Sequence, residues 1–323
     1  MEKISPAPKI ICVVGPTASG KTDLALALAR ELNGEIISAD SRQVYRCLDA
    51  GTAKPARDSS GRARGVPYHL IDEADPAEPF DAGRFAKKAQ STAEDILKRG
   101  NLPLLVGGTG LYVKAFLKGL SPMPRKNEAV RGRLEALGRE KGRTFLHAQL
   151  AAQDPAAAAK IPPNNIQRLV RALEVLEVSG RPISEMWGKT EEVRPRWNAL
   201  VLGVEWPAEQ LRRRIEARCR AMWPEILREI RALVPARYSG TEPGFQSLGY
   251  SEALAAWRGE ISQDDGLALF MRRTAAYAKR QRTWFRHQEN CAPVSGGDLG
   301  EMTRQALAAA KVFLEHVANG DRT

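Results

Sequence analysis

The 323-residue chain has few cysteines, few aromatic residues and no long apolar run. Its four cysteines, Cys12, Cys47, Cys219 and Cys291, form no CxxC pair, so the sequence indicates neither a disulfide framework nor a zinc site. No stretch of 18 or more residues is continuously apolar, and the apolar run at 10–14 is too short for a signal peptide. We therefore expect a cytoplasmic protein without a membrane-spanning segment.

The chain also has fewer acidic than basic residues. It contains 38 Asp and Glu and 49 Lys and Arg, which gives a net charge of +11. This surplus indicates an acidic partner such as nucleic acid or a phosphorylated ligand, the alternative being a basic protein that is merely soluble. The remaining composition, 43% hydrophobic and 27% charged, is ordinary for globular proteins and excludes disordered and collagen-like classes. The length predicts one large domain or two.

Strand and helix patterns alternate in the first 121 residues. Short β-branched or apolar runs predict strands at 10–14, 35–38 and 102–106, and amphipathic segments predict helices at 23–32 and 81–99. The run at 10–14 is continuously apolar, which is typical of a strand buried on both faces of a parallel sheet. This alternation predicts an α/β fold with a parallel sheet.

The strand pattern disappears after residue 121 and returns near residue 199. Helical segments are predicted at 127–141, 144–153 and 164–179, then a strand at 199–204 and long helices at 207–233 and 267–289. We expect four parts: the first part of a core (1–121), a helical insertion (122–198), the returning core (199–290) and a helical C-terminal tail (291–323).

A phosphate-binding loop follows the first predicted strand. Its residues match G-x-x-x-x-G-K-[ST] and are Gly15, Pro16, Thr17, Ala18, Ser19, Gly20, Lys21 and Thr22. The glycines let backbone N–H groups surround phosphate oxygens, Lys21 adds positive charge, and the Thr22 hydroxyl is the usual Mg²⁺ ligand. A chance glycine turn is the alternative. The expected fold is therefore a P-loop NTPase-like core, with a parallel sheet flanked by helices, plus an all-helical insertion domain.

No aspartate follows the predicted strand at 102–106, which leads into Gly107, Gly108 and Thr109. The chain thus lacks the Walker B aspartate that conventionally follows this strand in P-loop ATPases. Asp40 lies just past the strand at 35–38, at the carboxyl edge where ligands of open α/β sheets bind. It could bind Mg²⁺ or accept a proton from a nucleophile, but Asp is also a favoured helix N-cap, and both interpretations stay open.

Two predicted helices are rich in basic residues. Residues 211–220 hold five arginines, of which Arg214 and Arg218 lie one turn apart and suit a diphosphate. Residues 272–286 hold six cations and no acid, which favours contact with a phosphate backbone. A solvated helix surface is the alternative in each case. On the second helix, Phe270, Tyr277 and Trp284 form an aromatic stripe that we predict to be core.

Seven motifs occur in order along the chain, at 15–22, 40–45, 51–55, 107–112, 167–174, 248–250 and 278–286. On these motifs, the sequence from the phosphate-binding loop to about residue 290 resembles the tRNA dimethylallyltransferase (tRNA isopentenyltransferase) family. The resemblance implies transfer of a dimethylallyl group from dimethylallyl diphosphate to the exocyclic 6-amino group of the adenosine 3′ of the anticodon in tRNA. It also implies that the helical insertion binds the anticodon stem–loop.

The resemblance further implies catalytic roles for three residues. Asp40 would accept the amine proton, Thr109 would orient that site, and Arg214 would stabilise charge on the diphosphate. The loop at 15–22 would hold the diphosphate, with Mg²⁺ on Thr22. Arg213 and Arg218 are close enough in sequence to take the place of Arg214.

The resemblance also implies tRNA contacts, and the enzyme would extrude the target adenosine from its stack. The implied contacts are Asp40, Ser41, Arg42, Gln43, Thr109, Arg131, Gln167, Arg168, Leu169, Val170, Arg171, Phe245, Gln246, Ser247, Leu248, Gly249, Tyr250, Lys279, Arg280, Gln281, Arg282, Thr283, Trp284, Phe285 and Arg286. One departure is that residues 162–165 read Pro-Pro-Asn-Asn, where many members read His-Pro-Asn-Asp. The lost carboxylate affects a helix cap or a tRNA contact and leaves the transfer chemistry untouched.

Two other functions stay in view. An adenylate isopentenyltransferase acting on free AMP or ATP would share the phosphate-binding loop and Asp40, but the basic insertion argues against it. A nucleotide-driven RNA-binding protein without transfer activity is the other alternative. We expect the chain to act as a monomer on tRNA and dimethylallyl diphosphate, with no membrane partner.

Overall fold

The computed structural model describes residues 7–187, 196–288 and 291–315. The chain forms two compact units, one made of Met1–Lys118 with Pro195–Thr323 and the other of Gly119–Arg194. None of the helices among the described residues is long and apolar enough to cross a lipid bilayer.

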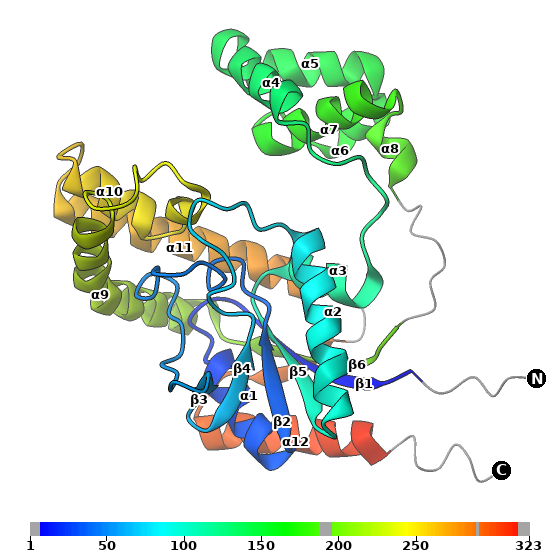
Figure 1. The fold of residues 1–323 in the computed structure, drawn as a ribbon, viewed down its shortest axis with the longest axis vertical. Helices are drawn as coiled ribbons and strands as arrows, with labels where there is room; N and C mark the ends of the chain where they lie inside the picture. Colours follow the sequence, from blue (N-terminus) through cyan, green and yellow to red (C-terminus); the bar gives the residue numbers. More distant parts are fainter. Residues whose placement is uncertain (1–6, 188–195, 289–290, 316–323) are drawn as a thin grey trace, which may run out of the picture. The chain divides into compact units, whose positions relative to one another are not determined.

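A seven-stranded sheet organises the first unit, with the strand order β3-β4-β2-β5-β1-β6-β7 (Figure 1). The strands are β1 Lys9–Val14, β2 Gly34–Ser38, β3 Arg62–Ala63, β4 Val66–His69, β5 Leu102–Gly107, β6 Asn198–Glu205 and β7 Cys291–Ser295. Every neighbouring pair is parallel except β3 and β4, which form a short antiparallel ladder at one edge. The expected α/β class with a mostly parallel sheet is confirmed.

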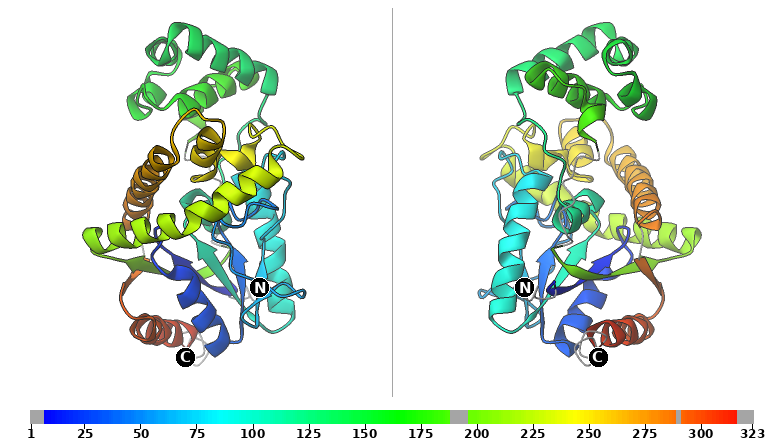
Figure 2. Two further views of the ribbon diagram at one scale, coloured as in Figure 1. Left: turned by 90° about the vertical axis from the view of Figure 1, so that its left-hand side faces the viewer. Right: turned by 90° about the vertical axis from the view of Figure 1, so that its right-hand side faces the viewer.

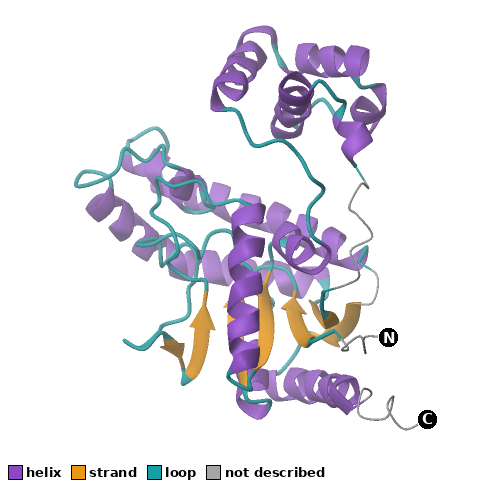
Figure 3. Ribbon diagram, turned by 45° about the vertical axis from the view of Figure 1, so that its right-hand side comes forward, coloured by secondary structure: helices purple, strands orange, loops and turns teal. Residues whose placement is uncertain are grey.

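Helices cover both faces of this sheet, as Figure 3 shows. On one face, α1 (Lys21–Glu31) and α12 (Leu299–Glu315) lie side by side (Figure 2) and share a core with alternate residues of β1 and β5. On the other face lie α2 (Ala82–Lys98) and α3 (Gly110–Lys118), where Phe85 and Tyr112 stack with ring centroids 4.2 Å apart. Because both faces are covered, β1 is apolar throughout from residue 10 to 14.

Three further helices, α9 (Ala208–Leu233), α10 (Tyr250–Trp257) and α11 (Gln263–Arg286), pack on one another. A 3₁₀ turn at Pro243–Gln246 precedes α10, and Trp223 of α9 stacks on Phe270 of α11 with ring centroids 6.2 Å apart. The apolar faces of these helices join the core on the α2 side of the sheet. These helices therefore share one hydrophobic core with that face of the sheet.

The described elements of the second unit are all helices, as expected for the insertion. They are α4 Glu128–Lys141, α5 Arg143–Gln153, α6 Pro155–Lys160, α7 Ile166–Ser179 and α8 Ile183–Met186, around a core of their own. Within that core Glu174 is fully buried and pairs with Arg131 at 2.8 Å and Arg171 at 3.0 Å. Asn165 caps α7, since its Oδ1 accepts the Arg168 N–H at 3.3 Å, so the asparagine supplies the cap without a carboxylate.

Some elements differ from the sequence expectations. Residues 291–323 were expected to be a helical tail, but they begin with β7, which pairs in parallel with β6 and extends the sheet. Pro293 hides this strand from pattern analysis, and it is tolerated because β7 lies at the sheet edge. The hairpin of β3 and β4 was also not predicted, because each strand is too short to show alternation. Residues 316–323 of the expected tail lie outside the described residues.

Candidate active site

Three neighbouring strands bring the predicted site residues to one edge of the sheet. The phosphate-binding loop follows β1, Asp40 follows β2, and Thr109 follows β5, which lies between the other two. The Thr109 Oγ1 accepts the Ser41 N–H at 3.0 Å, so the turns after β2 and β5 are joined directly. Gly107 permits this approach, since a Cβ there would lie 2.1 Å from the Ala39 carbonyl oxygen.

The phosphate-binding loop curls at the start of α1. Gly20 stands at the N-cap with a φ of 85°, a left-handed conformation that favours glycine. The Ser19 hydroxyl is buried and has no hydrogen-bond partner among the described residues. Burial lowers the pKa of Lys21 to about 8, although nearby Asp40 acts in the opposite direction. A bound phosphate would raise this pKa again by stabilising the charged amine.

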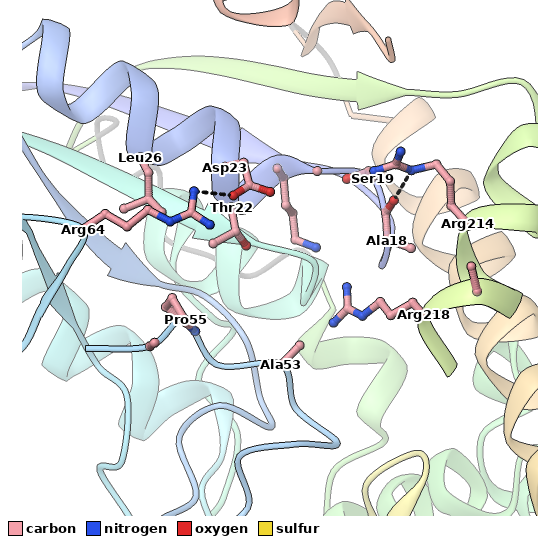
Figure 4. Close-up of a pocket in the computed structure, with 14 residues that line it drawn as sticks. Ala18, Ser19, Thr22, Asp23, Leu26, Ala53, Pro55, Arg64, Arg214 and Arg218 are labelled. Carbon is pink, nitrogen blue, oxygen red and sulfur yellow. Dashed lines mark hydrogen bonds and ion pairs between the residues drawn. The ribbon is translucent and has the colours of Figure 1, made fainter. Parts of the chain in front are cut away.

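A cavity of about 510 Å³ opens beside the loop (Figure 4). Its lining carries four cations, Lys21, Arg64, Arg214 and Arg218, and the single carboxylate of Asp23, which Arg64 binds at 2.8 Å. Figure 4 shows Arg218 extending into the cavity from α9. The other three cations have no carboxylate partner in the lining, although Asp40 lies near Lys21 and Arg218, and this excess of positive charge favours a multiply charged anion.

Arg214 is fixed against the loop by two contacts. Its Nε donates to the Ala18 carbonyl at 2.8 Å, and its guanidinium lies over the indole ring of Trp206, 4.4 Å from the centroid. Trp206 in turn donates from Nε1 to the Ser19 carbonyl at 2.9 Å. Arg213, by contrast, is exposed and pairs with Glu209 at 3.4 Å. Of the three arginines considered from sequence, Arg214 and Arg218 line the cavity and Arg213 does not.

Asp40 caps a turn and not a helix, which decides against the N-cap interpretation. Its Oδ1 accepts the Arg42 N–H at 2.9 Å, and residues 41–44 form turns. Two tyrosines outside the sequence predictions for the site lie near this carboxylate, namely Tyr68 of β4 and Tyr277 of α11. Burial, followed by the charge of Asp40, raises the pKa of each phenol. Tyr277 was expected to be core, but its side chain is only half-buried.

Many residues assigned to tRNA contact present polar side chains to solvent. Among them, Gln167, Arg168, Gln246, Lys279, Arg280, Thr283 and Arg286 are exposed. The side chains of others are buried in this structure, and their assignment to tRNA contact stays a prediction: Gln43, Leu169, Val170, Phe245, Ser247, Tyr250, Gln281 and Phe285. Within the same motifs, these buried residues belong to the packed interior and the exposed residues lie at the surface.

No cluster of three or more His, Cys, Asp or Glu side chains suitable for a metal occurs among the described residues. Mg²⁺ is commonly held by phosphate oxygens, water and one or two protein groups. The Thr22 hydroxyl lines the cavity beside Asp23 and can serve as such a group. The residues present therefore fit Mg²⁺ bound together with a phosphorylated ligand.

The chain matches two related family models. The family described as IPP transferase matches residues 43–288, and the family described as isopentenyl transferase matches residues 8–65. The first match covers more than half of the chain, including Thr109, Arg214 and the basic helix α11.

Curated relatives share the similarity over nearly their whole length. A tRNA dimethylallyltransferase of Anaeromyxobacter dehalogenans (strain 2CP-C) is 45% identical over 281 residues, or 87% of this chain and 92% of the relative. One from Roseiflexus sp. (strain RS-1) is 41% identical over 308 residues, or 95% of this chain and 99% of the relative.

Solved structures are similar as well. The tRNA isopentenylpyrophosphate transferase of Bacillus halodurans matches with a TM-score of 0.67 and 36% identity, over 95% of this chain and 99% of the other. A eukaryotic dimethylallyltransferase, solved acting on tRNA, matches with a TM-score of 0.78 and 25% identity, over 96% of this chain and 80% of the other.

Proposed function

The chain belongs to the IPP transferase family, whose curated relatives are tRNA dimethylallyltransferases, and from that premise we propose the substrates and roles of its site. It transfers a dimethylallyl group to tRNA. The donor is dimethylallyl diphosphate, and the acceptor is the exocyclic 6-amino group of the adenosine 3′ of the anticodon. The observation that carries this proposal is the cavity lined by Lys21, Arg214 and Arg218. Asp40 lies near enough to this cavity for its charge to act on the Lys21 amine.

Asp40 acts as the general base. The adenine nitrogen attacks C1 of the dimethylallyl group, the bond from C1 to the diphosphate oxygen breaks, and the proton lost by the nitrogen passes to the Asp40 carboxylate. The Ser41 N–H is already held by Thr109, and the Arg42 N–H by Asp40 itself, so the turn that carries the base is ordered before substrate arrives.

The diphosphate leaves toward the phosphate-binding loop. Lys21, Arg214 and Arg218 surround the cavity and offset the charge that develops on the departing oxygens. Mg²⁺ on the Thr22 hydroxyl would supply further electrostatic stabilisation to the diphosphate.

The tRNA is bound by exposed basic and polar side chains in both units. On α11 these are Lys279, Arg280 and Arg286, and on α7 the exposed Gln167 and Arg168 stand at the N-terminal turn. Contacts of this kind neutralise phosphates and carry little sequence information. They offset the cost of about a few kcal/mol for unstacking the target adenosine.

A label-transfer experiment tests the proposal. The protein is incubated with Mg²⁺, labelled dimethylallyl diphosphate and an anticodon stem–loop RNA, beside matched reactions in which guanosine replaces the target adenosine or AMP replaces the RNA. We expect label only on the RNA with adenosine at the target position, and loss of transfer when EDTA removes Mg²⁺. Label on AMP would instead show an adenylate isopentenyltransferase, and ATP hydrolysis without transfer would show a nucleotide-driven protein.

We also propose that the enzyme acts as a monomer in the cytoplasm, where its tRNA substrate is available. Light scattering of the purified protein, with and without the stem–loop RNA, measures the mass of the active species. A dimeric mass in both samples would contradict the monomer.

A further inference from the structure

Gln281 of α11 occupies a position unlike that of its basic neighbours. Its side chain is only 6% exposed, although it lies within the motif at 278–286 that the sequence assigns to tRNA contact. Its Oε1 accepts the Thr17 N–H at 2.8 Å, and its Nε2 donates to the Gly108 carbonyl at 2.8 Å. One side chain thus joins the phosphate-binding loop after β1 to the turn after β5.

The inward direction of Gln281 follows from helical spacing. Ala278 and Phe285, three residues before it and four after it, are also buried, so Gln281 lies on the core-facing side of α11. Lys279, Arg280 and Thr283 lie on the exposed side. The same segment therefore presents basic groups to solvent and a carboxamide to the loop.

The contact around Gln281 is tight and chemically specific. A Cβ on Gly108 would lie 2.2 Å from the Gln281 Nε2 and 3.2 Å from the Gly15 carbonyl oxygen, so the turn has no room for a larger residue. The two partners have opposite polarity, an N–H and a carbonyl, and a carboxamide satisfies both at once. Removing it would leave the Gly108 carbonyl and the partly buried Thr17 N–H without this partner, which is costly.

We propose that Gln281 is a positioning residue of the diphosphate site, acting through the Thr17 amide and the Gly108 carbonyl, and that it makes no direct contact with tRNA. It holds the start of the phosphate-binding loop at a fixed distance from the turn that carries Thr109. This inference rests on the proposed function, since it assumes that the loop binds the diphosphate.

The experiment measures binding of inorganic pyrophosphate with Mg²⁺ to the tRNA-free enzyme by calorimetry, and binding of the stem–loop RNA separately. Gln281→Met removes both hydrogen bonds at similar volume, and Gln281→Glu keeps an acceptor for Thr17 but has no hydrogen for Gly108. Gln288→Met is the matched control, because within the part of the chain that the structure describes the Gln288 side chain donates to the Trp284 carbonyl, at 3.3 Å, and not to the phosphate-binding loop. Melting temperatures show which variants are folded.

We expect Gln281→Met to weaken pyrophosphate binding about tenfold and RNA affinity to stay within about twofold for both variants. Gln281→Glu should weaken pyrophosphate binding at least as much, because its carboxylate would face the Gly108 carbonyl oxygen and the bound anion. If Gln281→Met fails to fold, Gln281→Glu carries the comparison. Loss of RNA affinity with unchanged pyrophosphate affinity would overturn the inference and show a direct tRNA contact. If the unmodified enzyme itself binds no pyrophosphate, the proposed donor site fails, and the role of Gln281 falls with it.

Discussion

The Arg214 guanidinium lies 4.4 Å from the centroid of the Trp206 indole ring, and the same indole donates to the Ser19 carbonyl at 2.9 Å. Trp206 therefore links a cavity-lining cation to the phosphate-binding loop. A cation over an aromatic face is stabilised by about 0.5–2 kcal/mol, and the contact also restricts the rotamers of the arginine.

Trp206→Leu removes both the ring face and the N–H. We expect the KM for dimethylallyl diphosphate to rise about tenfold while the KM for tRNA stays unchanged, because Arg214 loses its support. Trp206→Phe keeps a ring and should show a smaller rise. Trp257, which is 40% exposed on α10, provides the control variant Trp257→Leu. Equal losses for the Phe and Leu variants would mean that the ring face does not position Arg214.

Asp40→Asn tests the general base. The amide can still accept the Arg42 N–H, so the turn is retained, but it cannot take a proton. We expect kcat to fall by about 10²–10⁴ while the affinity for the stem–loop RNA changes little. Single-turnover kinetics and RNA binding measure the two quantities, with Asp264→Asn, an exposed substitution in the first turn of α11, as the control. An unchanged kcat would remove Asp40 from the proton transfer.

The lowered pKa of Lys21 predicts a pH dependence of diphosphate binding. Since burial brings this pKa from 10.5 to about 8, the amine of the free enzyme is mostly charged at pH 7 and mostly neutral at pH 9. The advantage of the unmodified enzyme over Lys21→Met in pyrophosphate affinity should therefore shrink as pH rises from 7 toward 9.5. Calorimetric titrations at each pH give this ratio, in which the ionisation of pyrophosphate cancels. A constant ratio would show that Lys21 keeps its charge.

The motif at 51–55 is explained by a contact with the motif at 248–250. A Cβ on Gly51 would lie 2.3 Å from the Tyr250 ring, and the Tyr250 hydroxyl accepts the Gly51 N–H at 3.0 Å while donating to Glu229. Gly51→Ala should therefore lower the free energy of unfolding by about 1–3 kcal/mol through overpacking. Urea unfolding measures this, with Gly132→Ala, where a Cβ has open space, as the control. Equal stability of both variants would contradict the close packing.

The sequence predicted those helices and strands whose apolar residues recur at regular helical or strand spacing. The helices at 23–32 and 81–99 and the strands at 10–14, 35–38 and 102–106 match α1, α2, β1, β2 and β5 within a few residues. The helix expected from residue 267 begins earlier, at Gln263, because Ser262 caps it through the Asp265 N–H and offsets the weak helix formers that follow.

The site was only partly predictable. Loop and strand order place Lys21, Asp40 and Thr109 together, since parallel strands present their carboxyl ends at one edge. The choice between Arg213, Arg214 and Arg218 depends on helix rotation, which sequence spacing does not define. Gln281 looks like another polar residue in a basic motif, and only the fold shows that it is buried. Arg64 reaches the cavity from the unpredicted hairpin, for which the sequence carries no signal.

The pairing of β1 with β6 also governs how the nascent chain acquires its structure. β1 comes from residues 9–14, but its second neighbour is made only at residues 198–205, and β7 and Gly296, which packs on the Trp206 ring, come after residue 290. Until then β1 has one open edge, the kind of surface that templates aggregation. A chain released from the ribosome before residue 198 would therefore need chaperone protection, even though its phosphate-binding loop at 15–22 is already complete.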